Sequence, residues 1–162
     1  MARFIVIATA VASAAFVLWL ARGLPEFVAS NFGLGGRVNS HMPRALFVGI
    51  MLIGGSLLPL AVWLLQCRAA RRGRYRMRAA THWYAPSQRA RTVAFLEAHV
   101  ACFSVAFTIF MTYVYWLAVA ANAALARAAP FDTGSFLVAL VGLFAFVAVW
   151  LAGLFWRFRT PG

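Results

Sequence analysis

The sequence predicts an all-α membrane protein: a bundle of four transmembrane helices that forms a single integral membrane domain over residues 1–162. Four apolar stretches, each long enough to cross a bilayer, alternate with more polar segments. Hydrophobic residues make up 64% of the chain and charged residues 11%, whereas soluble domains carry about a quarter charged residues. Eight of the fifteen arginines lie between the second and third stretches, as expected of a cytoplasmic loop. These observations argue against a water-soluble fold.

The first expected span covers residues 4–21. Its eighteen residues carry no charge, and they give about 27 Å of helix, just enough to cross the hydrocarbon core. The triplet at 12–14 (Ala-Ser-Ala) resembles a signal-peptidase site. The apolar run continues beyond it to Leu20, so we favour an uncleaved first helix over a cleaved leader. Trp19 suits a position at the membrane interface.

The connection at residues 23–44 mixes glycines and prolines with polar side chains. Glycine and proline interrupt regular structure and mark turns. Links between packed helices are usually about two to eight residues long. A connection of this length and composition is therefore expected to be ordered and to carry function. The sequence predicts an ordered loop between the first and second helices.

The second expected span, residues 45–66, contains the pair Gly54-Gly55 followed by Ser56 and Pro59. A proline inside a helix leaves a backbone carbonyl without its usual partner, and in lipid that group must be satisfied by the protein. We expect a kink between Ser56 and Pro59, with a neighbouring helix packed closely on the glycine pair. The functional alternative is a cavity lined at this level.

A basic segment, residues 67–94, separates the second and third spans. Its arginines are expected to contact anionic lipid headgroups, and each contributes on the order of 1 kcal/mol of attraction. The headgroup contacts are assigned to Arg71, Arg72, Arg74, Arg76 and Arg78. A protein partner such as a regulator is a further possibility for this surface. The net charge of +12 is also typical of nucleic-acid binding. Because most arginines flank apolar runs, where positive charge sets topology, we expect no nucleic-acid partner.

The third expected span, residues 95–121, lies within a longer helix from about residue 88 to about residue 122, with Ser87 as its expected N-cap. Glu97 and His99 lie where this helix enters the membrane. They are two positions apart, so they point to different helix faces. An ion pair of Glu97 with Arg89 or Arg91 is the simplest interpretation. The alternative is a ligand-binding or proton-handling site in which Glu97 and His99 face the bundle.

The fourth expected span covers residues 134–155, and the arginine distribution then gives the orientation. Four spans place both termini on the same side as the basic segment. Eleven arginines lie on that side and four on the other. The positive-inside rule therefore predicts cytoplasmic termini, an external loop at 23–44 and a multi-pass protein of the inner (plasma) membrane.

Catalytic, metal and cofactor sites are not indicated. The three acidic residues are Glu26, Glu97 and Asp132, which are too scattered for a mechanism with two carboxylates. Cys67 and Cys102 have no metal-ligand spacing and are expected to be small apolar residues. We therefore predict a non-enzymatic protein without a metal or cofactor.

The external loop, LPEFVASNFGLGGRVNSHMPRALF, resembles the N-terminal membrane domain of Sdp-type toxin-immunity proteins, a bacterial family known as domain of unknown function 1648. The matching positions are Leu24-Pro25, Phe32, Gly36, Asn39 and Pro59. The family has histidine where this chain has Asn31, which keeps only hydrogen bonding. The stretch from Tyr84-Ala85-Pro86 to His99 is also similar to a subset of members.

This resemblance implies that the loop is a recognition surface and that the basic face holds a regulator. It assigns ligand binding to Pro25, Asn31, Phe32 and Asn39. The sequence thus supports an inner-membrane protein that senses a ligand or gives immunity to a toxin through residues 23–44. The alternative is a small transporter, or a subunit of one, that uses the glycine pair, Pro59 and Glu97. A membrane-integral enzyme acting on lipids is a third hypothesis.

Overall fold

The computed structural model describes residues 2–33, 37–75, 77–127 and 134–159 of the chain. Four helical segments in this part are long and apolar enough to cross a membrane: Ala2–Gly23, Arg44–Arg71, Pro86–Ala126 and Gly134–Phe158. The prediction of four spans is confirmed by these lengths and compositions, and each helix extends beyond its expected apolar run. The chain is mostly helical and has the character of a multi-pass membrane protein.

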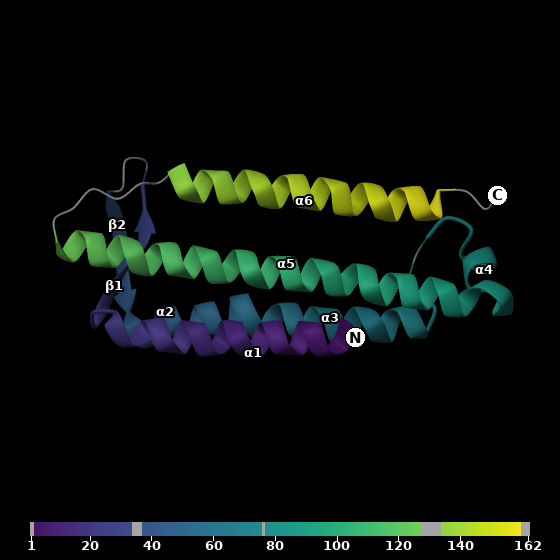
Figure 1. Cartoon of the computed structure of the whole chain (residues 1–162), viewed down its shortest axis with the longest axis horizontal. Helices are drawn as coiled ribbons and strands as arrows, with labels where there is room; N and C mark the ends of the chain where they lie inside the picture. The colour runs from purple at the N-terminus through teal and green to yellow at the C-terminus, as the bar shows by residue number, and fades with distance from the viewer. Residues whose placement is uncertain (1, 34–36, 76, 128–133, 160–162) are drawn as a thin grey trace.

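The long helices lie lengthwise beside one another (Figure 1). Helix α1 (Ala2–Leu20) ends in a 3-10 turn (Ala21–Gly23), and it packs against α5 (Pro86–Ala126). Helix α2 (Arg44–Leu52) continues through a π-helical turn (η2, Ile53–Leu57) into α3 (Leu58–Arg71), which also packs against α5. Helix α6 (Gly134–Phe158) packs mainly on α5. Helix α5 is therefore the central element of the bundle.

A β-hairpin occupies the connection between α1 and α2. Strand β1 (Phe27–Phe32) pairs antiparallel with β2 (Val38–Pro43), and an irregularity in the register follows Ala29. The all-α prediction omitted these strands. Val28 and Ala29 are adjacent and both are buried, so β1 lacks the strict alternation by which a half-buried strand is recognised in a sequence.

The hairpin and the basic segment lie at opposite ends of the bundle (Figure 1). The short helix α4 (Ala80–Trp83) and the last turn of α6 lie near the end where α5 begins, and α1 starts in the half of the bundle toward that end. We call this the arginine-rich end, and we call the other the hairpin end. Four spans that alternate in direction place these two connections at opposite ends, as the structure shows.

The basic connection is shorter than the predicted loop of residues 67–94, because helices extend into it from both sides. Helix α3 continues to Arg71 and ends in a Schellman motif: Gly73 has φ +66°, its N–H donates to Ala70 O, and Arg74 N–H donates to Ala69 O. Helix α5 begins at Pro86. The expected N-cap at Ser87 is therefore wrong: proline takes the first helical position, where its missing N–H costs no hydrogen bond.

The π-helical turn places the glycine pair against α5, as the sequence predicted. A Cβ atom added at Gly55 would lie 3.3 Å from Met111 Cβ. The hydroxyl of Ser56 donates to Ser13 Oγ at 3.1 Å, and Ser13 is bonded to Thr112 Oγ1 at 2.7 Å. Hydroxyls from α1, η2 and α5 therefore satisfy one another inside the apolar bundle.

Candidate functional site: a cavity beneath the hairpin

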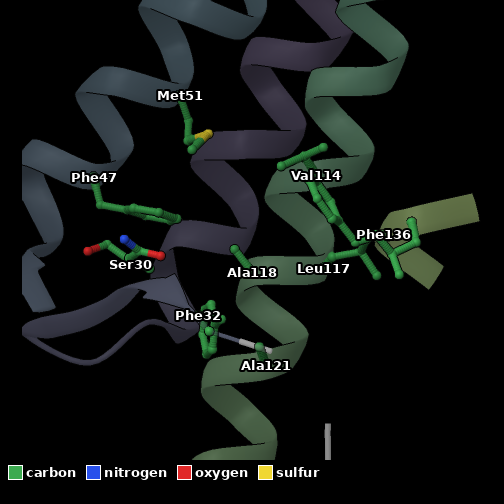
Figure 2. A pocket seen from close by; sticks show the side chains of 12 residues that line it. Ser30, Phe32, Phe47, Met51, Val114, Leu117, Ala118, Ala121 and Phe136 are labelled. Carbon is green, nitrogen blue, oxygen red and sulfur yellow. The ribbon is translucent and has the colours of Figure 1, made fainter. Parts of the chain in front are cut away.

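A cavity of about 610 Å³ lies between the hairpin and the helices at the hairpin end (Figure 2). Strand β1 and the residue after it contribute Ser30, Asn31, Phe32 and Gly33 to its lining. Helix α2 contributes Phe47 and Met51, α5 contributes Val114, Leu117, Ala118 and Ala121, and α6 contributes Phe136 and Leu137. The α5 positions follow the spacing of one helix face.

The chemistry of this lining is apolar except at the hairpin. Ser30 and Asn31 are the polar side chains among the lining residues, and none of the lining residues is charged. Phe47 stacks on Tyr115, whose hydroxyl donates to Val17 O at 3.2 Å. The cavity can therefore accept an apolar group and offer hydrogen bonds at one end.

The buried amide of Asn122 fixes the hairpin on α5. Its Oδ1 accepts from Ala29 N–H at 2.8 Å, while its Nδ2 donates to Ala29 O at 3.0 Å and to Ala118 O at 2.8 Å. Ala29 is 1% exposed, so its backbone groups need protein partners. One side chain thus satisfies both groups, as a neighbouring strand would, and holds β1 above the cavity.

The structure separates the predicted ligand-binding residues of the hairpin. Asn31 and Phe32 line the cavity. The side chain of Asn39 lies against Gly33, where an added Cβ would lie 3.2 Å from Asn39 Nδ2. Pro25 is exposed and precedes β1, outside the lining. Two of these four positions therefore belong to the cavity.

Glu97 and His99 lie in the half of α5 nearer the arginine-rich end, away from the cavity. Glu97 forms an ion pair with Arg71 of α3, so the expected pairing with Arg89 or Arg91 is wrong. Those arginines precede Glu97 on the same helix by about 12 and 9 Å along the axis, beyond the reach of a pair one turn apart. Arg89 instead donates to Arg71 O at 2.9 Å.

His99 connects α5 to α6. Its ring stacks on Phe95 (centroids 5.2 Å apart) and on Trp150 (4.4 Å), and Trp150 Nε1 donates to His99 O at 2.8 Å. Gly153 of α6 lies beside the imidazole, and a Cβ there would make an ordinary van der Waals contact with His99 Cε1 at 3.8 Å. Glu97 and His99 thus face different neighbours, as their spacing predicted. Neither contributes to the cavity.

The predicted headgroup-binding arginines are exposed where the structure describes them. Arg72, Arg74 and Arg78 are exposed, Arg71 is partly engaged by Glu97, and Arg76 lies outside the described residues. Burial raises the pKa of the neighbouring Tyr75 to about 12, so its phenol remains neutral even in alkaline buffer. The arginine-rich end can therefore attract anions.

Sequence reasoning missed the helical walls of the cavity and the amide that fixes its roof. In the sequence, the wall residues look like ordinary apolar positions of a transmembrane span. They form a cavity only because the helices bring them together. Asn122 carried a signal, because a polar side chain at the end of a transmembrane run usually has a specific partner. No protein-family model matches the chain, and no curated protein or solved structure matches it.

Proposed function

We propose that this chain is a non-enzymatic, multi-pass protein of a bacterial inner membrane that binds a ligand in the cavity beneath the hairpin, in sensing or toxin immunity. The observation that carries the proposal is the cavity itself, roofed by a hairpin that Asn122 holds in place. The hairpin end has few charges, whereas the opposite end carries most of the arginines.

The arginine distribution supports an orientation with the termini and the basic segment in the cytoplasm. The hairpin would then face the exterior, and the cavity would lie in the outer half of the membrane. Exposed arginines such as Arg72, Arg74 and Arg78 would hold the cytoplasmic end against anionic headgroups, or against a regulator.

The resemblance to the Sdp-type immunity family supports the same assignment. Asn31 occupies the position of the family's histidine, and it lies at the polar end of the cavity. An amide offers both a donor and an acceptor to a ligand. A neighbouring gene for a small secreted toxin or for a transcriptional repressor would support immunity and signalling.

A survival assay tests the proposal in the organism that carries the gene. Cells lacking the protein, challenged with medium conditioned by their siblings, are expected to survive less well than the parent. Wild-type protein should restore survival, and Ala118→Phe, which fills the cavity, should not. Ala123→Phe is the matched control, because Ala123 is exposed on the same helix. Equal survival of all strains would contradict the proposal.

The alternative of a small transporter is favoured by one observation, a hydroxyl cluster beside the π-helical turn that joins buried Ser13 and Ser56 to half-buried Thr112. In that case Glu97→Gln should abolish proton-coupled flux while the protein still folds. A sensor whose ligand binds beneath the hairpin should tolerate this change, since Glu97 lies outside the cavity lining.

A further inference from the structure

We propose that the cavity beneath the hairpin takes one acyl chain of a membrane lipid, which enters sideways between α5 and α6. The inference names the ligand class for the cavity of the proposed function and so rests on that function's choice of site. It depends on the chemistry of the lining, the depth of the cavity and the two hollows that lie along the seam between α5 and α6.

The lining suits a hydrocarbon chain better than a peptide or an ion. The α2, α5 and α6 walls supply only apolar side chains, and the polar side chains, Ser30 and Asn31, lie together on β1. A bound peptide would bury its own N–H and C=O groups against walls that cannot pair with them, at a large free-energy cost. An acyl chain has no such groups along its length. The volume of about 610 Å³ lies within the usual range for ligand pockets.

The walls lie at the depth of lipid tails. Arg127 follows the last residue of α5 and is exposed. Ala121 precedes it by about 9 Å along the helix axis, and Val114 precedes it by about 20 Å. A hydrocarbon core is about 30 Å thick, so with Arg127 at the headgroups the cavity spans most of one leaflet. Water-soluble ligands would have to pass the hairpin to reach these walls.

The seam between α5 and α6 provides an entrance at this depth. In the other half of the bundle α6 is held by Trp150 on His99 and by Phe158 on Phe95, whose ring centroids are 5.6 Å apart. At the hairpin end α6 instead borders the cavity, and a second hollow of about 590 Å³ is lined by Tyr113 of α5 and Val138 of α6. Val138 is 74% exposed. Two hollows therefore lie along the seam between α5 and α6 at the hairpin end, where tails would enter.

Native mass spectrometry of the full-length protein in detergent tests this inference. The protein is supplied with phosphatidylcholine or with phosphatidylglycerol, and gas-phase activation then strips loosely held lipid. We expect the wild type to retain one lipid in the cavity with either headgroup, because the cavity lining carries no charge. Ala118→Phe should reduce the retained fraction by about tenfold or more, since it overfills the site. Ala123→Phe should leave it unchanged.

A second variant and a folding check distinguish loss of lipid binding from misfolding. Met51→Trp fills the cavity from the α2 wall, and circular dichroism checks that each variant retains its helices. Equal retention by the wild type and both filled variants would overturn the inference. Retention of phosphatidylglycerol alone, unaffected by the fillings, would also overturn it and would assign the lipid to the arginine-rich end. If survival in conditioned medium still depends on Ala118 in either case, the proposed function stands while the lipid ligand is rejected.

Discussion

At the scale of single residues, the side-chain amide of Asn122 determines whether strand β1 stays over the cavity. Asn122 satisfies both backbone groups of Ala29 and also bonds to Ala118 O, all within a buried environment. A buried backbone group left without a partner costs about 1–3 kcal/mol. Since a two-stranded hairpin alone is marginally stable at best, this contact helps to decide whether β1 remains on the bundle.

Replacing Asn122 with alanine should release the hairpin without unfolding the spans. The change leaves the N–H and the C=O of Ala29 unpaired, so we expect a loss of about 2–6 kcal/mol in the free energy of hairpin opening. Hydrogen exchange in lipid nanodiscs measures it, as faster exchange across residues 27–32 with unchanged protection in the centre of α5. Asn39→Ala is the control, because that side chain is exposed on β2. Unchanged protection of β1 in Asn122→Ala would show that the amide does not hold the hairpin.

Residue partnerships were the least predictable property of the sequence. The single acidic residue of the third span was expected to pair within its own helix, yet Glu97 pairs with Arg71. The correct pair requires knowledge that α3 lies beside α5, which no local pattern contains. The same reason explains why Phe47, Met51 and Phe136 were not recognised as parts of one site.

At the scale of elements, apolar length predicted the four spans, while the ends of α3 and α5 follow the backbone motif at Gly73 and the proline at Pro86. The apolar runs predicted α1 and α6 within a few residues, because a bilayer demands a minimum length. The extension of α3 and the first turns of α5 carry arginines, which lower the hydropathy and so place these residues outside the predicted spans. The hairpin was missed because Val28 and Ala29 are buried side by side against α5 and α2.

A substitution in the glycine pair tests how closely η2 must approach α5. In Gly55→Ala the new Cβ would lie 3.3 Å from Met111 Cβ, which is attached directly to the backbone of α5, so the helices must separate slightly. Gly49→Ala is the matched control, because nothing lies within 4 Å of a Cβ there. Both changes gain similar helix propensity. We expect Gly55→Ala to be less stable than Gly49→Ala by about 1–3 kcal/mol, measured by unfolding in mixed micelles. Equal stabilities would show that the contact is loose.

At the scale of the whole molecule, most of the arginines lie toward one end of the long axis of the bundle. The basic segment and the end of α6 lie toward one end, α1 starts in the same half, and the hairpin with its cavity occupies the other end (Figure 1). The sequence could predict this separation because each span reverses the direction of the chain. It could not predict that β1, α2, α5 and α6 would converge on one cavity, because that depends on how the helices pack.

Orientation in the membrane is the prediction on which the proposed role of the hairpin depends. A reporter that is active only outside the cell should be active when inserted near Gly35 and silent near Gly73 or after Gly162. A fluorescent reporter that folds only in the cytoplasm should give the reverse pattern. An external signal near Gly73 would show that the hairpin faces the cytoplasm and cannot meet a secreted toxin.

Neutralising Arg71, Arg72, Arg74, Arg76 and Arg78 together changes the count of arginines on the two sides from eleven against four to six against four. Because the arginine bias sets the orientation, this variant should give signals at both sides for each position, whereas neutralising Arg22 and Arg37 should leave the pattern unchanged.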